Sequence, residues 1–168
     1  RFFERAEIKN AMAYLRLIQT RHNDAALERV INLPARGIGE KTVEALRDFA
    51  RQQDLSLWAA LHEAVGSKAI AGRAASALNA FVELVDELAL KVEGLPLHSM
   101  VQRVIEQSGL LAYHRDEKGE KGQTRVENLE ELVSAARAFD HYEGEEGDEA
   151  QTPLASRLGC YFLFRLTG

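Results

Sequence analysis

The chain of 168 residues contains one cysteine, Cys160, so no disulfide can form within it, and this composition fits a reducing compartment. No apolar run reaches the length of about 18 residues that indicates a membrane-spanning helix. The N-terminal stretch Arg1 to Arg5 has neither an initiator methionine nor the pattern of a signal peptide. The apolar share of 46% and the charged share of 28% are typical of a soluble globular protein. We therefore expect one domain, or one large subdomain, cut from a longer protein.

Residue patterns for catalysis are missing as well. No G-x-x-x-x-G-K-[ST] loop is present to bind the phosphates of ATP. The five histidines are scattered, without the H-x-x-x-H spacing or the cysteine partner typical of metal ligands. The neighbouring carboxylates Glu130 and Glu131 would point in different directions on a helix, which makes them a poor acid–base pair. The sequence predicts no catalytic residue and no metal site.

The net charge of −5 is unevenly distributed. Residues 1–53 hold ten Lys or Arg against seven Asp or Glu, whereas residues 54–168 hold eleven against nineteen. Binding to nucleic acid depends on local basic surface, so the acidic total does not exclude DNA. It does argue against strong binding by this chain alone.

Apolar residues recur at helical spacing along most of the chain, and strand signals are almost absent. Helices are expected at about 4–20, 25–32, 40–53, after the cap Ser56, at 67–92, at 97–107 and from Thr124 onward. Trp58 and Phe81 have apolar neighbours at helical spacing and are expected in the core. The charged stretch 114–123 is expected to be a loop, and the acidic stretch 143–149 a solvated linker. The predicted fold is all-α, with about seven helices.

The segment "NLPARGIGEKTVEAL" (32–46) joins two expected helices through two glycines that are one residue apart. Gly37 and Gly39 permit positive φ angles and lack a Cβ, so their backbone can approach a ligand closely. The amides that follow stand at a helix N-terminus, where the dipole favours an anion. With Arg36 and Lys41 beside the turn, this is the layout of a helix-hairpin-helix element that grips the duplex backbone. A turn that only connects two helices would use the same glycines, so this short pattern leaves both interpretations open.

A more specific signal comes from four longer segments. They are "RFFERAEIKNAMAYLRLI" (1–18), "LPARGIGEKTVEALR" (33–47), "AGRAASALNAFVELVDEL" (71–88) and "EKGEKGQTRVENLEELVSAAR" (117–137). Together, in this order and approximate spacing, they resemble the UvrD/Rep/PcrA family of superfamily 1A DNA helicases over roughly residues 1–155. The final stretch "RLGCYFLFRLTG" departs from the family's pattern.

The resemblance implies that most of the chain is subdomain 2B, a helical insertion within the second RecA-like motor domain, 2A. With the acidic stretch and the departing tail added, the expected division is a junction helix leading out of 2A at 1–20, the 2B subdomain at 21–142, an acidic linker at 143–153 and an atypical apolar tail at 154–168. The family's duplex contact maps onto Gly37, Ile38 and Gly39, with Arg36 and Lys41 as inferred neighbours. For three further cations, contact with DNA, contact with another subdomain and simple solvation all stay open: Lys118, Lys121 and Arg125.

For the whole protein, the resemblance implies an ATP-dependent helicase that moves 3′ to 5′ on single-stranded DNA, uses ATP and Mg²⁺, and acts in nucleotide excision and mismatch repair. This chain would hold no cofactor and would be inactive alone. The expected partners are DNA, as a duplex or at a single-strand/duplex junction, the remaining helicase subdomains and DNA repair proteins, in the bacterial cytoplasm at the nucleoid and without a membrane. The alternative is a protein-interaction module that regulates the motor and has negligible DNA affinity of its own. The acidic total favours this alternative, and the basic N-terminal third favours DNA.

Overall fold

The computed structural model describes the backbone of residues 1–146 and the side chains of residues 1–141. In this part of the chain a short 3-10 helix, Phe2–Glu4, precedes eight α-helices, and there is no strand. The α-helices are α1 (Ala6–Gln19), α2 (Asp24–Val30), α3 (Glu40–Gln53), α4 (Leu57–Gly66), α5 (Gly72–Val92), α6 (Leu97–Gln107), α7 (Leu110–Arg115) and α8 (Glu120–Glu146). The predicted all-α fold is confirmed. Among these helices, none combines the length and the apolar character needed to cross a membrane.

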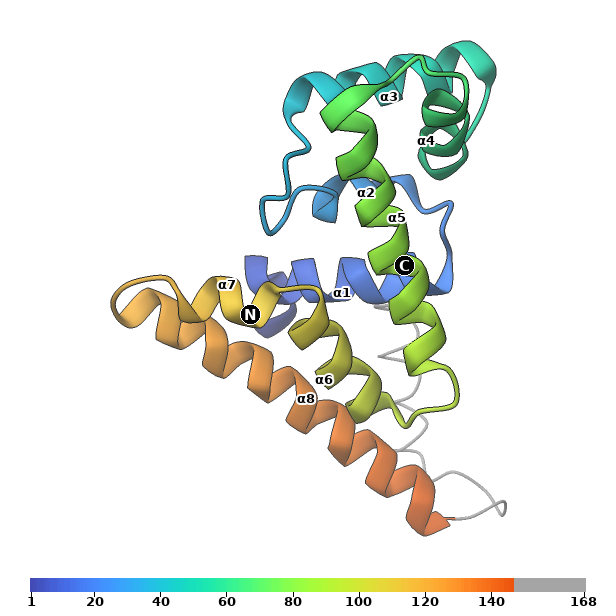
Figure 1. The fold of residues 1–168 in the computed structure, drawn as a ribbon. Coiled ribbons are helices and arrows are strands. Elements are labelled where there is room, and N and C mark those ends of the chain that lie inside the picture. The colour runs from blue at the N-terminus through green and yellow to red at the C-terminus, as the bar shows by residue number, and fades with distance from the viewer. Residues whose placement is uncertain (147–168) are drawn as a thin grey trace. The chain divides into compact units, whose positions relative to one another are not determined.

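The chain divides into two compact units (Figure 1). Each unit buries its own set of apolar side chains. The first, here called the α6–α8 unit, comprises Arg1–Leu15 and the chain from Val92 onward. The second, the α2–α5 unit, comprises Arg16–Lys91. Since the boundaries fall inside α1 and close to the end of α5, both of these helices contribute to both units.

In the α2–α5 unit, two short polar side chains fix the start of α4. Ser56 caps α4 by accepting a hydrogen bond from the Ala59 amide at 3.2 Å, as the sequence predicts. Asp24, the first residue of α2, accepts a hydrogen bond from the Leu57 amide at 2.9 Å. This contact joins the beginning of α2 to the beginning of α4. Helix α3 also packs against α4. Trp58 lies in the core, as predicted.

In the α6–α8 unit, α6 and α7 pack along the long helix α8 (Figure 1). Near the end of α8, the Asp140 carboxylate accepts hydrogen bonds from the amides of Leu97 and His98 at 3.0 and 2.8 Å. It therefore caps the start of α6 from a different helix. His98 reinforces the cap, because its Nδ1 lies 2.6 Å from the same carboxylate.

The expected loop at 114–123 is wrong, because only the residues between α7 and α8 lie outside helices. The sequence missed α7, and α8 begins at Glu120 rather than at Thr124. Gly122, which suggested a loop, lies in the first turn of α8. A Cβ at this position would stand 2.5 Å from the Glu117 carbonyl oxygen and 2.7 Å from that of His114. The glycine is therefore needed for close approach between α8 and the end of α7 rather than for a flexible turn.

Two other helix boundaries differ from the sequence prediction by more than two residues. Helix α5 begins at Gly72 instead of near residue 67, because Lys68 takes a positive φ of 64° after α4 ends. Helix α8 continues to Glu146, so the first residues of the expected acidic linker are helical. Glutamate is a good helix former, and extending an existing helix costs little. The rest of that linker and the tail at 154–168 lie outside the described residues.

Candidate functional site

The connection between α2 and α3, residues 31–39, is here called the glycine turn. Ile38 is only 1% exposed, whereas the glycines on either side of it are exposed. Gly37 has a φ of +83°, a conformation that other residues rarely adopt. Gly39 is extended, with φ −81° and ψ 175°, and serves as the N-cap of α3. The Ile38 side chain thus anchors the turn in the core, while the backbone beside it faces outward.

The outward-facing backbone leaves hydrogen-bond donors unused. Gly39 has no side chain to cap α3, and within the described residues the amides of Gly39, Glu40 and Lys41 donate no hydrogen bond. A Cβ built on Gly39 would have no neighbour within 4 Å. These donors stand at the N-terminus of a helix of 14 residues, where the helix dipole is positive. The arrangement can accept an anion.

The two basic side chains expected beside the turn differ in their surroundings. Lys41 is exposed and takes part in no ion pair among the described residues. Arg36 is half-buried, and its Nη1 donates to the carbonyl oxygens of Val30 and Ile31 at 2.6 and 2.9 Å. Its guanidinium carbon lies 5.3 Å from the centroid of the Phe81 ring, which is buried as predicted. Lys41 is available to a ligand, whereas Arg36 is bound to the protein.

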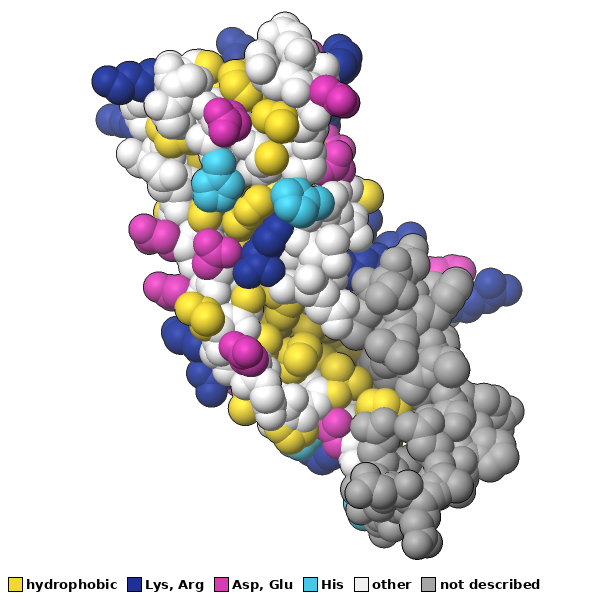
Figure 2. All heavy atoms as spheres, turned by 90° about the vertical axis from the view of Figure 1, so that its right-hand side faces the viewer, with side chains coloured by type: hydrophobic (Ala, Val, Ile, Leu, Met, Phe, Trp, Pro, Cys, Tyr) yellow, Lys and Arg dark blue, Asp and Glu magenta, His cyan; other side chains and the backbone are white. Residues whose placement is uncertain are grey.

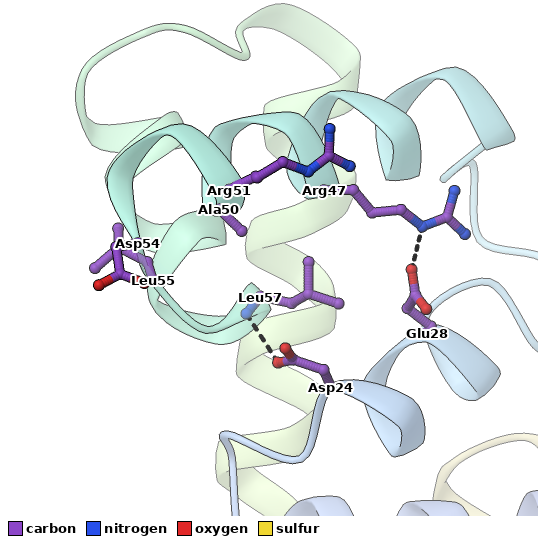
Figure 3. A pocket seen from close by; sticks show the side chains of 8 residues that line it. All are labelled: Asp24, Glu28, Arg47, Ala50, Arg51, Asp54, Leu55 and Leu57. Carbon is purple, nitrogen blue, oxygen red and sulfur yellow. Dashed lines mark hydrogen bonds and ion pairs between the residues drawn. The ribbon is translucent and has the colours of Figure 1, made fainter.

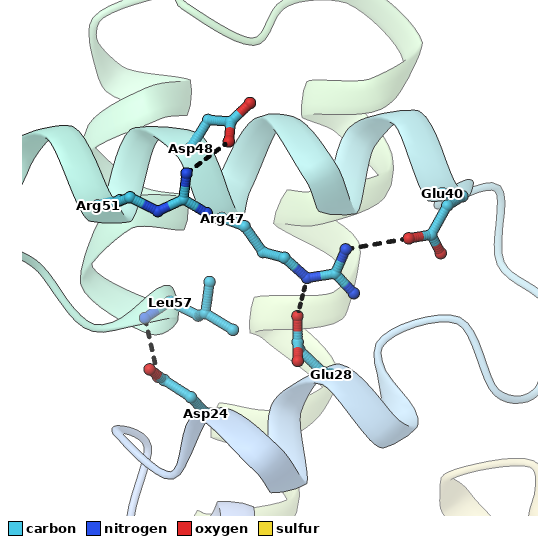
Figure 4. Close-up of polar contacts among 7 residues, drawn as sticks. All are labelled: Asp24, Glu28, Glu40, Arg47, Asp48, Arg51 and Leu57. Atoms are coloured by element: carbon cyan, nitrogen blue, oxygen red, sulfur yellow. Dashed lines mark hydrogen bonds and ion pairs between the residues drawn. The ribbon is translucent and has the colours of Figure 1, made fainter.

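A third arginine, Arg47, ties α2 to the start of α3 (Figure 4). Its Nε pairs with Glu28, and its Nη1 lies 3.0 Å from the Glu40 carboxylate. The hydrogen bonds from Glu28 and then Glu40 raise the pKa of Arg47 above its ordinary value. Arg47 therefore balances two carboxylates and adds no net positive charge for a ligand.

A pocket with mixed charge lies beside this ion pair. Its lining consists of Asp24, Glu28, Arg47, Ala50, Arg51, Asp54, Leu55 and Leu57 (Figure 3). Three carboxylates stand against two arginines, and Arg51 also pairs with Asp48 at 3.5 Å. The pocket therefore has no basic surplus with which to hold an anion. In the described residues no group of three His, Cys, Asp or Glu side chains is placed to bind a metal ion.

One basic residue near the turn was not singled out from the sequence. Arg73 is exposed on α5 and forms no ion pair within the described part of the chain. It lies one helical turn before Ala77, whose Cβ would be 4.0 Å from a Cβ placed on Gly37. Because residues four apart share a helix face, Arg73 lies on the same face of α5 as Ala77, which is the face that meets the glycine turn. Its place in a helical segment gave no sign of which way it faces.

The other three predicted cations belong to the α6–α8 unit and not to the unit that carries the glycine turn. Lys118 and Lys121 are exposed and form no ion pair within the described residues. Arg125 is half-buried, with Nη1 2.7 Å from the Glu117 carboxylate and Nε 3.9 Å from that of Glu7. Arg125 thus has a clear role inside its own unit, and a role for the two lysines stays a prediction.

Arg125 is part of a network of polar side-chain contacts that links α7 to α1. His114 Nδ1 donates to Glu117, Arg125 contacts both Glu117 and Glu7, and Asn128 Nδ2 donates to Glu7 at 2.9 Å. Glu7 and Asn128 are only 5% and 6% exposed. This network of polar contacts therefore joins α1, α7 and α8 through buried or half-buried side chains.

The hydrogen bonds from His114 and then Arg125 hold the pKa of Glu117 below its ordinary value of 4.5. Ionised Glu117 therefore stabilises the fold above the unfolded-state pKa, and this contribution is lost as the pH falls through the lower folded-state pKa. We expect Glu117→Gln to be less stable than the unaltered chain at pH 7, and the difference to shrink as the pH falls below 4.5 and through the lower folded-state pKa. Urea unfolding followed by circular dichroism at a series of pH values would measure it.

The exposed Glu130 of α8 supplies the control for this measurement. Glu130→Gln should follow the unaltered chain at every pH, because no described side chain forms an ion pair with Glu130. A constant difference between Glu117→Gln and the unaltered chain from pH 7 to pH 3 would contradict the role given to Glu117.

Comparison with known proteins gives a consistent result. Residues 1–158 match the family described as UvrD-like helicase C-terminal domain. The chain is 56% identical over 158 residues to "DNA helicase II" of Escherichia coli (strain K12), an alignment that covers 94% of this chain and 22% of that protein. It is 52% identical over 139 residues to "DNA helicase II" of Haemophilus influenzae, covering 83% and 19%. It is 34% identical over 170 residues to "ATP-dependent DNA helicase PcrA" of Staphylococcus aureus (strain Mu50), covering 99% and 22%.

These matches confirm the resemblance found in the sequence, which was expected over roughly residues 1–155. The chain spans about a fifth of the length of the curated relatives that it matches. What it shares with them is one part of a longer protein.

Proposed function

The chain belongs to the UvrD-like helicase C-terminal domain family, and from this premise we propose that it is the 2B subdomain of an ATP-dependent DNA helicase that moves 3′ to 5′. The names of its relatives, DNA helicase II and ATP-dependent DNA helicase PcrA, support this activity for the whole protein. ATP and Mg²⁺ would bind outside this chain, which has no phosphate-binding loop. Work in nucleotide excision and mismatch repair, with repair proteins as partners and the bacterial nucleoid as location, follows from the same proposal.

Within that helicase, we infer that the glycine turn contacts the backbone of duplex DNA. The observation that carries this inference is the set of unused amides from Gly39 to Lys41. A phosphate oxygen can accept hydrogen bonds from such amides, and the Lys41 ammonium adds a positive charge beside them. In this interpretation α2, the turn and α3 form a helix-hairpin-helix element that binds without reading base sequence. Arg73 on α5 would extend the contact by a further cation.

The balanced charge of the α2–α5 unit favours a contact with only a few phosphates of the DNA. Residues 16–91 hold ten Lys or Arg and ten Asp or Glu. On the side of this unit that Figure 2 shows, which faces away from the glycine turn, positive and negative side chains are interspersed and form no continuous basic patch. Since both the affinity for DNA and its salt dependence grow with the number of phosphates neutralised, we expect weak binding through about one to three phosphates, with a correspondingly shallow salt dependence.

The same charge balance favours the second candidate function, a protein-interaction module that regulates the helicase motor. Such a module needs no excess of basic side chains, and the α6–α8 unit, in which acidic residues outnumber basic ones, could meet a basic partner. The two candidates predict different behaviour of this chain with DNA alone.

The test is fluorescence anisotropy of a labelled duplex with a 3′ single-stranded tail, titrated with the chain at several salt concentrations. We expect the logarithm of the affinity to fall with the logarithm of salt by about 0.9 for each phosphate contacted. Lys41→Ala should weaken binding and lower this slope by about 0.9, because one contact is lost. Arg51→Ala removes the same charge from the other end of α3, where Arg51 already pairs with Asp48, and should change neither. If the unaltered chain does not bind duplex at the lowest salt, the second candidate function is the better one.

A further inference from the structure

We propose that Asn32 and Arg36 are positioning residues that hold the glycine turn in the shape that binds phosphate, and that neither side chain contacts the DNA. The inference rests on the proposed function, because the backbone that they hold is the proposed duplex contact. It also gives Arg36 a role different from the direct neighbour of DNA that the sequence suggests.

Asn32 closes the turn from within. Its Oδ1 accepts two hydrogen bonds, from the Arg36 amide at 2.8 Å and from the Ile38 amide at 3.1 Å. Side-chain acceptors of this kind replace backbone pairing in tight turns. Because these two amides are turned toward Asn32, they are not available to an outside ligand, unlike the amides that follow at Gly39, Glu40 and Lys41.

Arg36 fixes the same turn to two helices. Its Nη1 donates to the carbonyl oxygens of Val30 and Ile31, which end α2 and carry partial negative charge. The guanidinium also lies 5.3 Å from the centre of the buried Phe81 ring of α5, within the range of a cation–π contact. A phosphate could reach this guanidinium only by replacing charge-assisted hydrogen bonds that the protein already makes.

A substitution of Arg36 that keeps its positive charge can distinguish a positioning role from direct contact with phosphate. Lysine at position 36 retains the positive charge but lacks the planar fork that bonds two carbonyls and stacks on a ring. We expect Arg36→Lys to weaken duplex binding on the order of tenfold, the equivalent of one charge-assisted hydrogen bond, and to leave the salt slope unchanged. Asn32→Ala, which alters no charge, should do the same. Arg51→Lys, at the far end of α3, should bind like the unaltered chain.

The opposite pattern would overturn the proposal. If Arg36 contacted phosphate directly, Arg36→Lys would retain nearly full affinity and Arg36→Ala would lower the salt slope by about 0.9. That outcome would return Arg36 to the set of direct contacts.

A second measurement needs no DNA and keeps this inference separate from the proposed function. Amide hydrogen exchange, followed by NMR, should show a slowly exchanging Ile38 amide that becomes fast in Asn32→Ala and in Arg36→Lys. The amide of the buried Leu46 in α3 should stay protected, which would exclude general unfolding. Unchanged Ile38 exchange in both variants would overturn the positioning role. If no protein in the series binds duplex but Ile38 exchange rises, the proposed duplex contact fails while the hold of Asn32 and Arg36 on the turn is upheld.

Discussion

A Gly39→Asp variant is expected to bind duplex DNA about 30-fold more weakly than the unaltered chain, although it should unfold at the same urea concentration or a slightly higher one. Gly39 is the N-cap of α3 and already has the extended backbone that an N-cap needs. Aspartate is among the preferred residues there, and a Cβ at this position meets nothing within 4 Å. The expected change in the free energy of unfolding is therefore a gain of only a few tenths of a kcal/mol.

The loss of binding follows from the same geometry. The new carboxylate would accept a hydrogen bond from the amides at the start of α3, which are the donors proposed for phosphate. It would also place a negative charge next to the phosphate, and close like charges cost on the order of 2 kcal/mol or more, which corresponds to about 30-fold in affinity. Gly37 is less suitable for this test, because its φ of +83° would make any side chain strained and would mix folding with binding.

Gln52→Glu is the matched control for Gly39→Asp. Gln52 is exposed in the last turn of α3, so this variant adds the same charge to the opposite end of the same helix. It should bind duplex like the unaltered chain in the anisotropy titration. Equal binding by Gly39→Asp and the unaltered chain would contradict the assignment of the α3 amides to phosphate. Equal losses in both variants would point to the overall charge instead.

The sequence predicts helices well where their ends are set by local signals. Helix α3 runs from Glu40 to Gln53 and α6 from Leu97 to Gln107, both as expected. A glycine precedes the first and a proline the second, and each acts within a single turn of chain. Gly122 was misinterpreted because its reason is not local: it lets α8 approach two carbonyls at the end of α7. A glycine that serves close packing has the same sequence signature as one that serves a loop.

The same distinction holds for the candidate site. The positions of the two turn glycines and the exposure of Lys41 follow from local patterns that the sequence displays. The inward role of Arg36 does not, because its ring partner Phe81 comes from α5. Arg125 likewise pairs with Glu7 and Glu117, which belong to α1 and to the connection before α8. A basic residue near a turn indicates a phosphate contact only after its partners within the fold are known.

A second large effect is expected in the α6–α8 unit, where Asn128→Asp should lower the stability at pH 7 by about 3 kcal/mol or more. Asn128 and Glu7 are both nearly inaccessible to solvent, and the Asn128 Nδ2 donates to the Glu7 carboxylate at 2.9 Å. Aspartate would replace this donor by an acceptor and bring two carboxylates together. Arg125 is the nearest described cation, and its Nε lies 3.9 Å from Glu7, too far for a short hydrogen bond.

The loss of stability should depend on pH in a definite direction. Two buried carboxyl groups in contact can share one proton, so the folded variant would bind a proton that the unfolded chain does not bind at the same pH. Stability falls with rising pH wherever the folded state binds more protons. Asn128→Asp should therefore regain stability between pH 7 and about pH 5, before protonation of other carboxylates weakens every variant. Urea unfolding at both pH values, followed by circular dichroism, measures this recovery.

Asn79→Asp is the control that makes the same substitution at an exposed position, where no buried contact is lost. Asn79 is exposed on α5, where a new carboxylate stays hydrated, so this variant should match the unaltered chain within about 0.5 kcal/mol at both pH values. Equal stability of the two aspartate variants at pH 7 would mean that water reaches the contact between Glu7 and Asn128. A large deficit in Asn128→Asp that did not shrink toward pH 5 would mean that the two carboxyl groups move apart instead of sharing a proton. Recovery toward pH 5 in Asn128→Asp alone would establish that α1 is held to α8 through a buried hydrogen bond that tolerates only one carboxylate.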